Sequence, residues 1–314
     1  MAAREQELLP LGYVHIVFTI PEPLARLALV NKRVVYDLLF RSAAATLLQV
    51  AANPKRLGAA IGGLMVLHTW GQRLQHHPHV HCVVPAGGLS PDGVRWIHAR
   101  PTFFLPVKVL RQVYRGKLVA GLRTAFHQGR LSCPGTLQAL ATEAGFRAWL
   151  RSLYHQPWVV YAKPPFGSPS HVLHYLARYT HRVAISNHRL VAVTDDTVAF
   201  RWKDYRHGSQ IRTLTLAVDE FLRRFLLHVL PKRFVRIRYF GLLAPRCRAD
   251  DLATCRKALA VAPTRPAQEA SVTSKPRSTW PCPRCGAPMR IVERLTARQL
   301  FLETLLAACF HDTS

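Results

Sequence analysis

Two histidines separated by one residue, His79 and His81, are the first candidates for chemistry in the sequence. Side chains alternate between the two faces of a β-strand, so both imidazoles are expected on one face, where they can present two ligands to one metal ion. His68 and Gln72, on the strand predicted just before, are candidates for a third ligand. Two alternatives stay open: a surface cluster of histidines around His76, and a structural, buried role for His68.

A set of histidine nitrogens and amide oxygens with open positions suits Mg²⁺ or Mn²⁺ when a substrate phosphate completes the coordination shell. Histidines would also accept zinc. The ligand types therefore leave the metal open, with Mg²⁺ or Mn²⁺ as the prediction.

Tyr175 and Tyr179 form the second candidate group, with Arg178 and Arg182 at the same four-residue interval. On a helix, residues four apart lie on one face, so both hydroxyls are expected together. Simple packing of two tyrosines is the alternative. A tyrosine can form a covalent intermediate with a phosphate that a metal ion polarises, which makes the cutting of a phosphodiester reversible.

The charge of the chain indicates its partner. The 314 residues contain 43 Lys and Arg against 17 Asp and Glu, a formal net charge of +26. Such an excess attracts polyanions, and nucleic acid is the expected partner. The most apolar stretch noted, 57–67, is too short to span a membrane, and the polar start of the chain does not resemble a signal peptide. We therefore expect a cytoplasmic protein without membrane spans.

The segments that position these groups are predicted from apolar periodicity and from Pro and Gly breaks. A hairpin of strands over 64–72 and 80–85 carries the histidines and ends at Gly87-Gly88. A helix over 172–181 carries the tyrosines. The further predicted strands are 12–20, 158–162 and a meander within 191–216, and the further predicted helices are 22–52, 107–126, 137–154 and 221–230.

Basic residues alternate with aromatic ones in two later segments, around Trp202 and around Phe234. Mixed cationic and aromatic side chains suit phosphate contacts combined with base stacking, while a solvated face with structural aromatics is the alternative. The predicted DNA-binding residues are Arg178, Arg182, Lys203, Arg206, Lys232, Arg233, Arg236 and Arg238.

The C-terminal part contains Cys282 and Cys285 in a Cys-Pro-Arg-Cys-Gly knuckle of the kind that holds Zn²⁺. A structural zinc site needs four ligands, and Cys309 and His311 are the nearby residues that remain. A metal-free tail is the alternative. The seven cysteines show no spacing typical of a disulfide framework. A Pro-, Ser- and Thr-rich stretch over 262–281 is predicted to be a flexible linker.

Six segments, in order, resemble the two-tyrosine transposases of the HUH endonuclease superfamily, in particular rolling-circle insertion-sequence transposases. They cover roughly residues 8–250: GYVHIVFTIP at 12–21, HTWGQ at 68–72, HPHVH at 77–81, WVVYAKPP at 158–165, YLARYTHR at 175–182 and IRYFGLLA at 237–244.

The resemblance implies an α+β fold, with an antiparallel sheet flanked by helices, the histidines on a central strand and the tyrosines on a facing helix. It implies that His79 and His81 bind a divalent metal and that Tyr175 and Tyr179 form 5′-phosphotyrosine links to single-stranded DNA. The expected domains are a nicking domain over 1–250, a helix and flexible linker over 251–281, and a CxxC segment over 282–314.

One departure from the family pattern bears on function. Family members usually begin with a cysteine-rich zinc module, and this chain begins close to its first predicted strand, so recognition of DNA ends is open. A replication initiator or relaxase with the same chemistry is one alternative function. An inactive, truncated DNA-binding remnant is the other.

Overall fold

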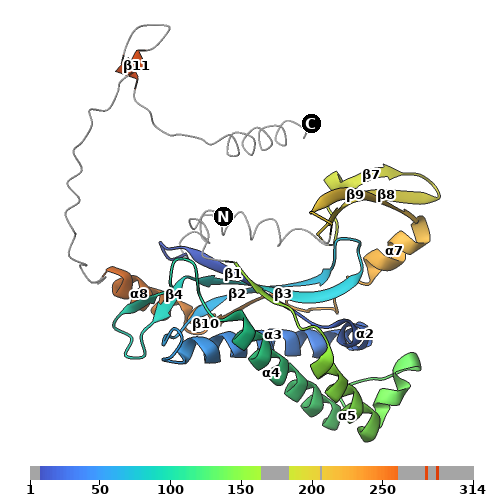
Figure 1. The fold of residues 1–314 in the computed structure, drawn as a ribbon, viewed down its shortest axis with the longest axis horizontal. Coiled ribbons are helices and arrows are strands. Elements are labelled where there is room, and N and C mark those ends of the chain that lie inside the picture. The colour runs from blue at the N-terminus through green and yellow to red at the C-terminus, as the bar shows by residue number, and fades with distance from the viewer. Residues whose placement is uncertain (1–7, 164–183, 206, 261–279, 282–287, 290–314) are drawn as a thin grey trace. The chain divides into compact units, whose positions relative to one another are not determined.

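The computed structural model describes residues 8–163, 184–205, 207–260, 280–281 and 288–289. Its main feature is a five-stranded antiparallel sheet in the order β10-β2-β3-β1-β6 (Figure 1). The bounds are β1 Tyr13–Thr19, β2 Gly62–Trp70, β3 His76–Pro85, β6 Val160–Ala162 and β10 Ile237–Gly241. The predicted α+β class is confirmed, and β3, which carries His79 and His81, is the central strand.

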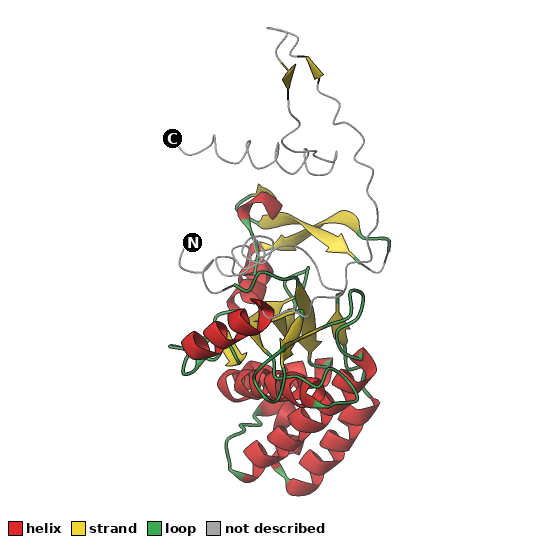
Figure 2. Ribbon diagram, turned by 90° about the vertical axis from the view of Figure 1, so that its left-hand side faces the viewer, coloured by secondary structure: helices red, strands yellow, loops and turns green. Residues whose placement is uncertain are grey.

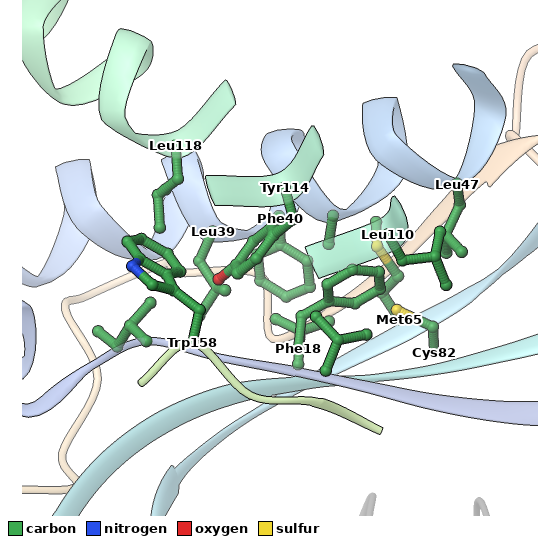
Figure 3. Close-up of a cluster of buried hydrophobic side chains, with 14 of the residues drawn as sticks. Phe18, Leu39, Phe40, Leu47, Met65, Cys82, Leu110, Tyr114, Leu118 and Trp158 are labelled. Atoms are coloured by element: carbon green, nitrogen blue, oxygen red, sulfur yellow. The ribbon is translucent and has the colours of Figure 1, made fainter. Parts of the chain in front are cut away.

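Helices cover one face of this sheet (Figures 1 and 2). They are α2 Glu22–Val30, α3 Lys32–Ala52, α4 Val107–His127 and α5 Glu143–Ser152. The strands present every second residue to these helices: Phe18 from β1, Met65 from β2 and Cys82 from β3 lie in one buried cluster with Phe40 and Tyr114 of the helices (Figure 3). The residues between them face the other side of the sheet, which is where the histidines lie.

Phe18 tests the importance of this core, because its side chain is fully buried and its ring lies 4.9 Å from that of Tyr114. Truncation leaves a cavity in addition to the lost burial, so Phe18→Ala is expected to lower the free energy of unfolding by about 3–5 kcal/mol. Urea denaturation measures this change. Val94→Ala, at an exposed position, is the control and should stay within about 0.5 kcal/mol of the unchanged protein.

The helix predicted over 22–52 is in fact two helices, broken at Asn31. The Asn31 amide nitrogen donates to the carbonyls of Leu27 (3.1 Å) and Ser132 (2.8 Å), and its side-chain oxygen accepts from the Ser132 backbone N–H at 2.8 Å. These bonds to a distant loop favour a break that local periodicity does not reveal.

A second, three-stranded sheet has the order β7-β8-β9, with β7 Leu190–Val193, β8 Thr197–Asp204 and β9 Gln210–Ala217, followed by α7 Val218–Leu226. The predicted meander is confirmed. This sheet packs on the tip of the β2–β3 hairpin through a buried cluster of Leu74, Ala184 and Phe200. It lies at one end of the main sheet, opposite the helical layer (Figures 1 and 2).

One further local prediction was wrong and one strand was missed. The β2–β3 hairpin ends at Pro85, just before Gly87 and Gly88 as predicted, and these glycines also begin β4 (Gly87–Leu89), which pairs with β5 (Trp96–His98). The segment predicted as a helix over 137–154 begins as a 3-10 helix, Gly135–Ala141, and becomes α-helical at Glu143. Strand β10 was not predicted as a strand at all.

The chain divides into two compact units, 1–262 and 263–314. Helix α8 (Arg248–Ala260) packs in the first unit, where Leu252 and Cys255 lie in one buried cluster with Leu9 and Trp96. Strands β11 (Trp280–Pro281) and β12 (Pro288–Met289) pair in the second unit. The helix predicted over 172–181 and the linker predicted over 262–281, apart from its last two residues, lie outside the described residues, and the three-part domain division stays a prediction.

One helix in the described part of the chain, α3, is long and apolar enough to cross a membrane by length and composition alone. The sequence-based expectation had pointed to 57–67 as the most apolar stretch instead. Of the most apolar window of α3, 56% is buried within the protein. Tyr36, Leu39 and Leu47 of this helix belong to the main buried cluster, which is the position of a core helix.

Candidate metal and nucleic-acid site

Three histidines meet on the face of the sheet away from the helices. His68 on β2 is directly opposite His79 on β3, and Val66 is opposite His81, so all three imidazoles lie on the same face. One ring nitrogen from each of His68, His79 and His81 lies within 4.8 Å of the others, an arrangement able to hold a metal ion. The predicted pair and one of its two candidate third partners are therefore together.

The hydrogen bond of His79 fixes which of its nitrogens can bind a metal. Its Nδ1 lies 2.6 Å from the backbone oxygen of His77. A carbonyl can only accept, so Nδ1 carries the proton and Nε2 keeps its lone pair. Metal-binding histidines in proteins commonly donate their other N–H in this way, which orients the ring.

His81 has an outer partner that the sequence did not suggest. Its Nδ1 lies 2.8 Å from Nε2 of His15 on β1, and the two rings are stacked with an interplanar angle of 2°. His15 is buried, and it comes from the same face of the sheet because Val14 and Ile16 on either side of it belong to the core. The alternation within 12–20 carries a signal for His15. If its apolar residues are assigned to the face covered by the helices, His15 falls on the opposite face.

These imidazoles are neutral at physiological pH. Burial, with smaller contributions from neighbouring histidines, lowers the pKa of His79 to about 3 and holds the pKa of His68 and of His81 well below the usual range. Burial, with a smaller effect of Lys163, lowers the pKa of His15 to about 4. Neutral imidazole is the form that binds metals.

Gln72, the other candidate for third ligand, also lines a cavity over the histidines, and both of its oxygens accept hydrogen bonds. It lies beyond the end of β2, and its side-chain oxygen accepts a hydrogen bond from the backbone N–H of Lys203 at 3.2 Å. Its backbone oxygen accepts from the Arg189 guanidinium. Gln72 thereby ties the hairpin tip to the three-stranded sheet, and the sequence argument missed this because the register shifts between His68 and Trp70.

A cavity of about 710 Å³ opens over the histidines. One side is formed by His68, His77, His79 and His81, and the other side by β8, β9 and Arg189. Four of the residues around it are Arg or Lys, and Asp204 is the one acidic residue among them. Such a lining favours an anionic ligand next to the metal-binding nitrogens.

The predicted DNA-binding residues are not all at this cavity. Lys203 lines it. Arg236 lies instead beside Trp70 and His228 at a smaller cavity of about 250 Å³. Arg238 forms an ion pair with Asp37 and lies over the ring of Phe40 at 4.3 Å.

Two others of this set, Lys232 and Arg233, are in the turn before β10, where the Lys232 carbonyl accepts a hydrogen bond from Arg33. The remaining predicted site residues lie outside the described residues. They are Tyr175, Tyr179, Arg178, Arg182, Arg206, Cys282 and Cys285.

Comparison with known proteins identifies the family. Residues 62–251 match the family described as "Putative transposase". The chain is 54% identical over 265 residues to "Putative transposase y4qJ" of Sinorhizobium fredii, covering 84% of this chain and 67% of that protein. It is 32% identical over 281 residues to the transposase for insertion sequence element IS801 of Pseudomonas savastanoi pv. phaseolicola, covering 88% of this chain and 66% of that protein.

This chain thus spans about two thirds of the length of both relatives. Among solved structures, the metal-bound conjugative relaxase TrwC in complex with oriT DNA matches over 78% of this chain and 71% of its own, at 14% identity and a TM-score of 0.29, which is a distant likeness. With a family match over more than half of its residues and two transposases as relatives, the chain belongs to the two-tyrosine transposase family.

Proposed function

We propose that the protein nicks and rejoins single-stranded DNA in rolling-circle transposition, using a divalent metal and a 5′-phosphotyrosine intermediate. The observation that carries the proposal is the cluster of His68, His79 and His81 beneath a basic cavity in a chain of this family. A replication initiator or relaxase would use the same chemistry, but the two relatives named above are described as a putative transposase and a transposase.

The three histidines fit a divalent metal because they are neutral, converge on one point and, at His79 and His81, are oriented by outer hydrogen bonds. When bound, Mg²⁺ or Mn²⁺ would polarise a non-bridging oxygen of the scissile phosphate. Three nitrogen ligands leave positions for that oxygen and for water, although zinc is also compatible with the donor set.

The roles of the protein's own groups follow from their chemistry. The hydroxyl of Tyr175 or Tyr179 would attack the phosphorus, lose its proton and become joined to the 5′-phosphate, while the 3′-oxygen leaves and takes up a proton. The basic residues around the cavity, such as Lys203 and Arg189, would hold the neighbouring phosphates. Two tyrosines would allow cleavage and strand transfer to alternate.

The test is to trap the intermediate. The protein is incubated with Mn²⁺ and single-stranded DNA from the ends of the element, labelled on its 3′ side, and then denatured. The label should migrate with the protein, and EDTA should prevent this. DNA binding that is salt-sensitive but leaves no adduct under any of these conditions would instead identify an inactive DNA-binding remnant.

The contact between His15 and His81 gives a separate prediction about the metal. If His81 binds through Nε2, its Nδ1 must donate to His15, so His15→Ala should lower the affinity for Mn²⁺ by about 10- to 100-fold. His15→Gln, which keeps an acceptor, should recover part of the loss. Titration of Mn²⁺ followed by electron paramagnetic resonance measures the affinity.

His98→Ala is the matched control for His15, because His98 is an exposed histidine on β5, away from the cluster. Its affinity for Mn²⁺ should equal that of the unchanged protein. An unchanged affinity in His15→Ala would show that His15 only packs against His81.

A further inference from the structure

The inward face of the three-stranded sheet changes character along its length. On β8 this face carries Val198, Phe200, Trp202 and Asp204 in turn, each paired with a residue of β9. The first two are buried, and Phe200 packs against Leu74 of the hairpin tip. Trp202 and Asp204 lie beyond that contact and line the cavity over the histidines. The apolar half of the face therefore attaches the sheet, and the other half is turned to the cavity.

Trp202 has the surroundings of a stacking residue. It is half-buried, the Arg73 guanidinium lies 5.2 Å from its ring centre, and Arg212 is its direct partner on β9. Arg73 comes from the hairpin tip and Arg212 from β9, so each wall of the cavity contributes a cation next to Trp202 in the structure or in the strand register. An indole held in place beside cations can stack a nucleobase while the cations neutralise its phosphate.

Asp204 explains how an acidic group is tolerated in this basic cavity. Its Oδ2 lies 2.8 Å from Nδ1 of His207 and 3.4 Å from Nε of Arg212. Asp204 is buried. The carboxylate thus holds His207 and Arg212 at the rim of the cavity, and its own charge is offset by these neighbours.

We propose that this cavity is a nucleotide-binding subsite for single-stranded DNA beside the metal site, in which one base stacks on Trp202 and its phosphate contacts Arg73 and Arg212. The inference rests on the proposed function only in taking single-stranded DNA as the ligand. The cavity volume of about 710 Å³ accommodates a ligand of this size. The subsite would fix the position of the strand relative to His68, His79 and His81.

The experiment separates base stacking from phosphate attraction. Two labelled strands of twenty nucleotides are compared by fluorescence anisotropy in EDTA: oligothymidylate, and a strand of the same length made of abasic residues. Both carry the same phosphates, so the electrostatic contribution is matched between them. The unchanged protein should bind oligothymidylate more tightly than the abasic strand.

Trp202→Ala should reduce this preference by about five- to a hundredfold, because stacking of a base on an aromatic side chain contributes that much per base. Trp202→Phe should keep most of it. Trp202→Leu, which preserves more of the packing, should behave like Trp202→Ala and serves if the alanine variant is unstable. Trp149→Ala, at another half-buried tryptophan on α5, should leave the preference unchanged.

Each result has a distinct reading. An equal loss for both strands, or no loss for either, in a Trp202 variant that still binds Mn²⁺ would overturn the subsite. Because the binding assay contains no metal, it is independent of the cutting chemistry. A preference that depends on Trp202 in a protein that never forms an adduct would support the subsite while contradicting the proposed function.

Discussion

Replacing Tyr175 and Tyr179 together with phenylalanine is expected to abolish the covalent adduct between the protein and single-stranded DNA. Phenylalanine keeps the ring but removes the oxygen that would bond to phosphorus, so no phosphotyrosine can form. The adduct should fall below detection in the denaturing gel. The affinity for uncut DNA should change little, because the basic residues that hold the phosphates are unaltered.

Tyr154→Phe is the matched control, since it replaces an exposed tyrosine of the described chain by the same change. This variant should form the adduct at the rate of the unchanged protein. The single variants Tyr175→Phe and Tyr179→Phe should each retain an adduct on the remaining tyrosine if both residues act as nucleophiles. An adduct that persists in the double variant would assign the nucleophile to another residue.

Replacing His79 and His81 together with alanine is expected to have the second-largest effect, on both metal affinity and cutting. Two of the three convergent nitrogens are lost, so Mn²⁺ affinity should fall by more than the roughly 10- to 100-fold expected for loss of an outer partner such as His15. A metal contributes several kcal/mol of transition-state stabilisation, so adduct formation should slow by about a hundredfold or more.

Mn²⁺ titration and the rate of adduct formation measure the two effects of this change independently. His98→Ala, outside the cluster, should alter neither. If the double histidine variant binds Mn²⁺ and cuts DNA as before, the metal site must lie elsewhere. If it loses Mn²⁺ but still forms the adduct, the chemistry does not depend on this metal.

Much of the sheet could be predicted because its strands are locally distinct. The segment 12–20 is rich in β-branched and aromatic residues and ends at a proline, and the bounds of β1 agree with it to within one residue at each end. His68 was predicted to share a face of the β2–β3 hairpin with the histidine pair, and the register, which pairs His68 with His79, places it there. Period-two alternation was enough to place His79 and His81 on one face.

Other parts of the fold depend on contacts that sequence periodicity does not carry. Strand β10 pairs with β2 about 170 residues earlier, and its five residues mix charged and aromatic side chains without a clear core face. The position of Gln72 depends on the register shift after His68. The position of Asp204 at the cavity depends on how the three-stranded sheet packs against the β2–β3 hairpin. Long-range pairing of this kind is decided by tertiary packing rather than by local preference.

The register shift between His68 and Trp70 has a consequence for the two ends of the hairpin. Between the pairs His68–His79 and Trp70–His76, β2 advances two residues and β3 advances three, so the extra residue is absorbed at His77 and Pro78. A one-residue slip in the part of β3 that carries His79 and His81 would turn their side chains to the face covered by the helices. The extra residue thus separates the register at His68 and His79 from the register at the hairpin tip, so Leu74 can pack against Phe200 while the three histidines stay on one face of the sheet.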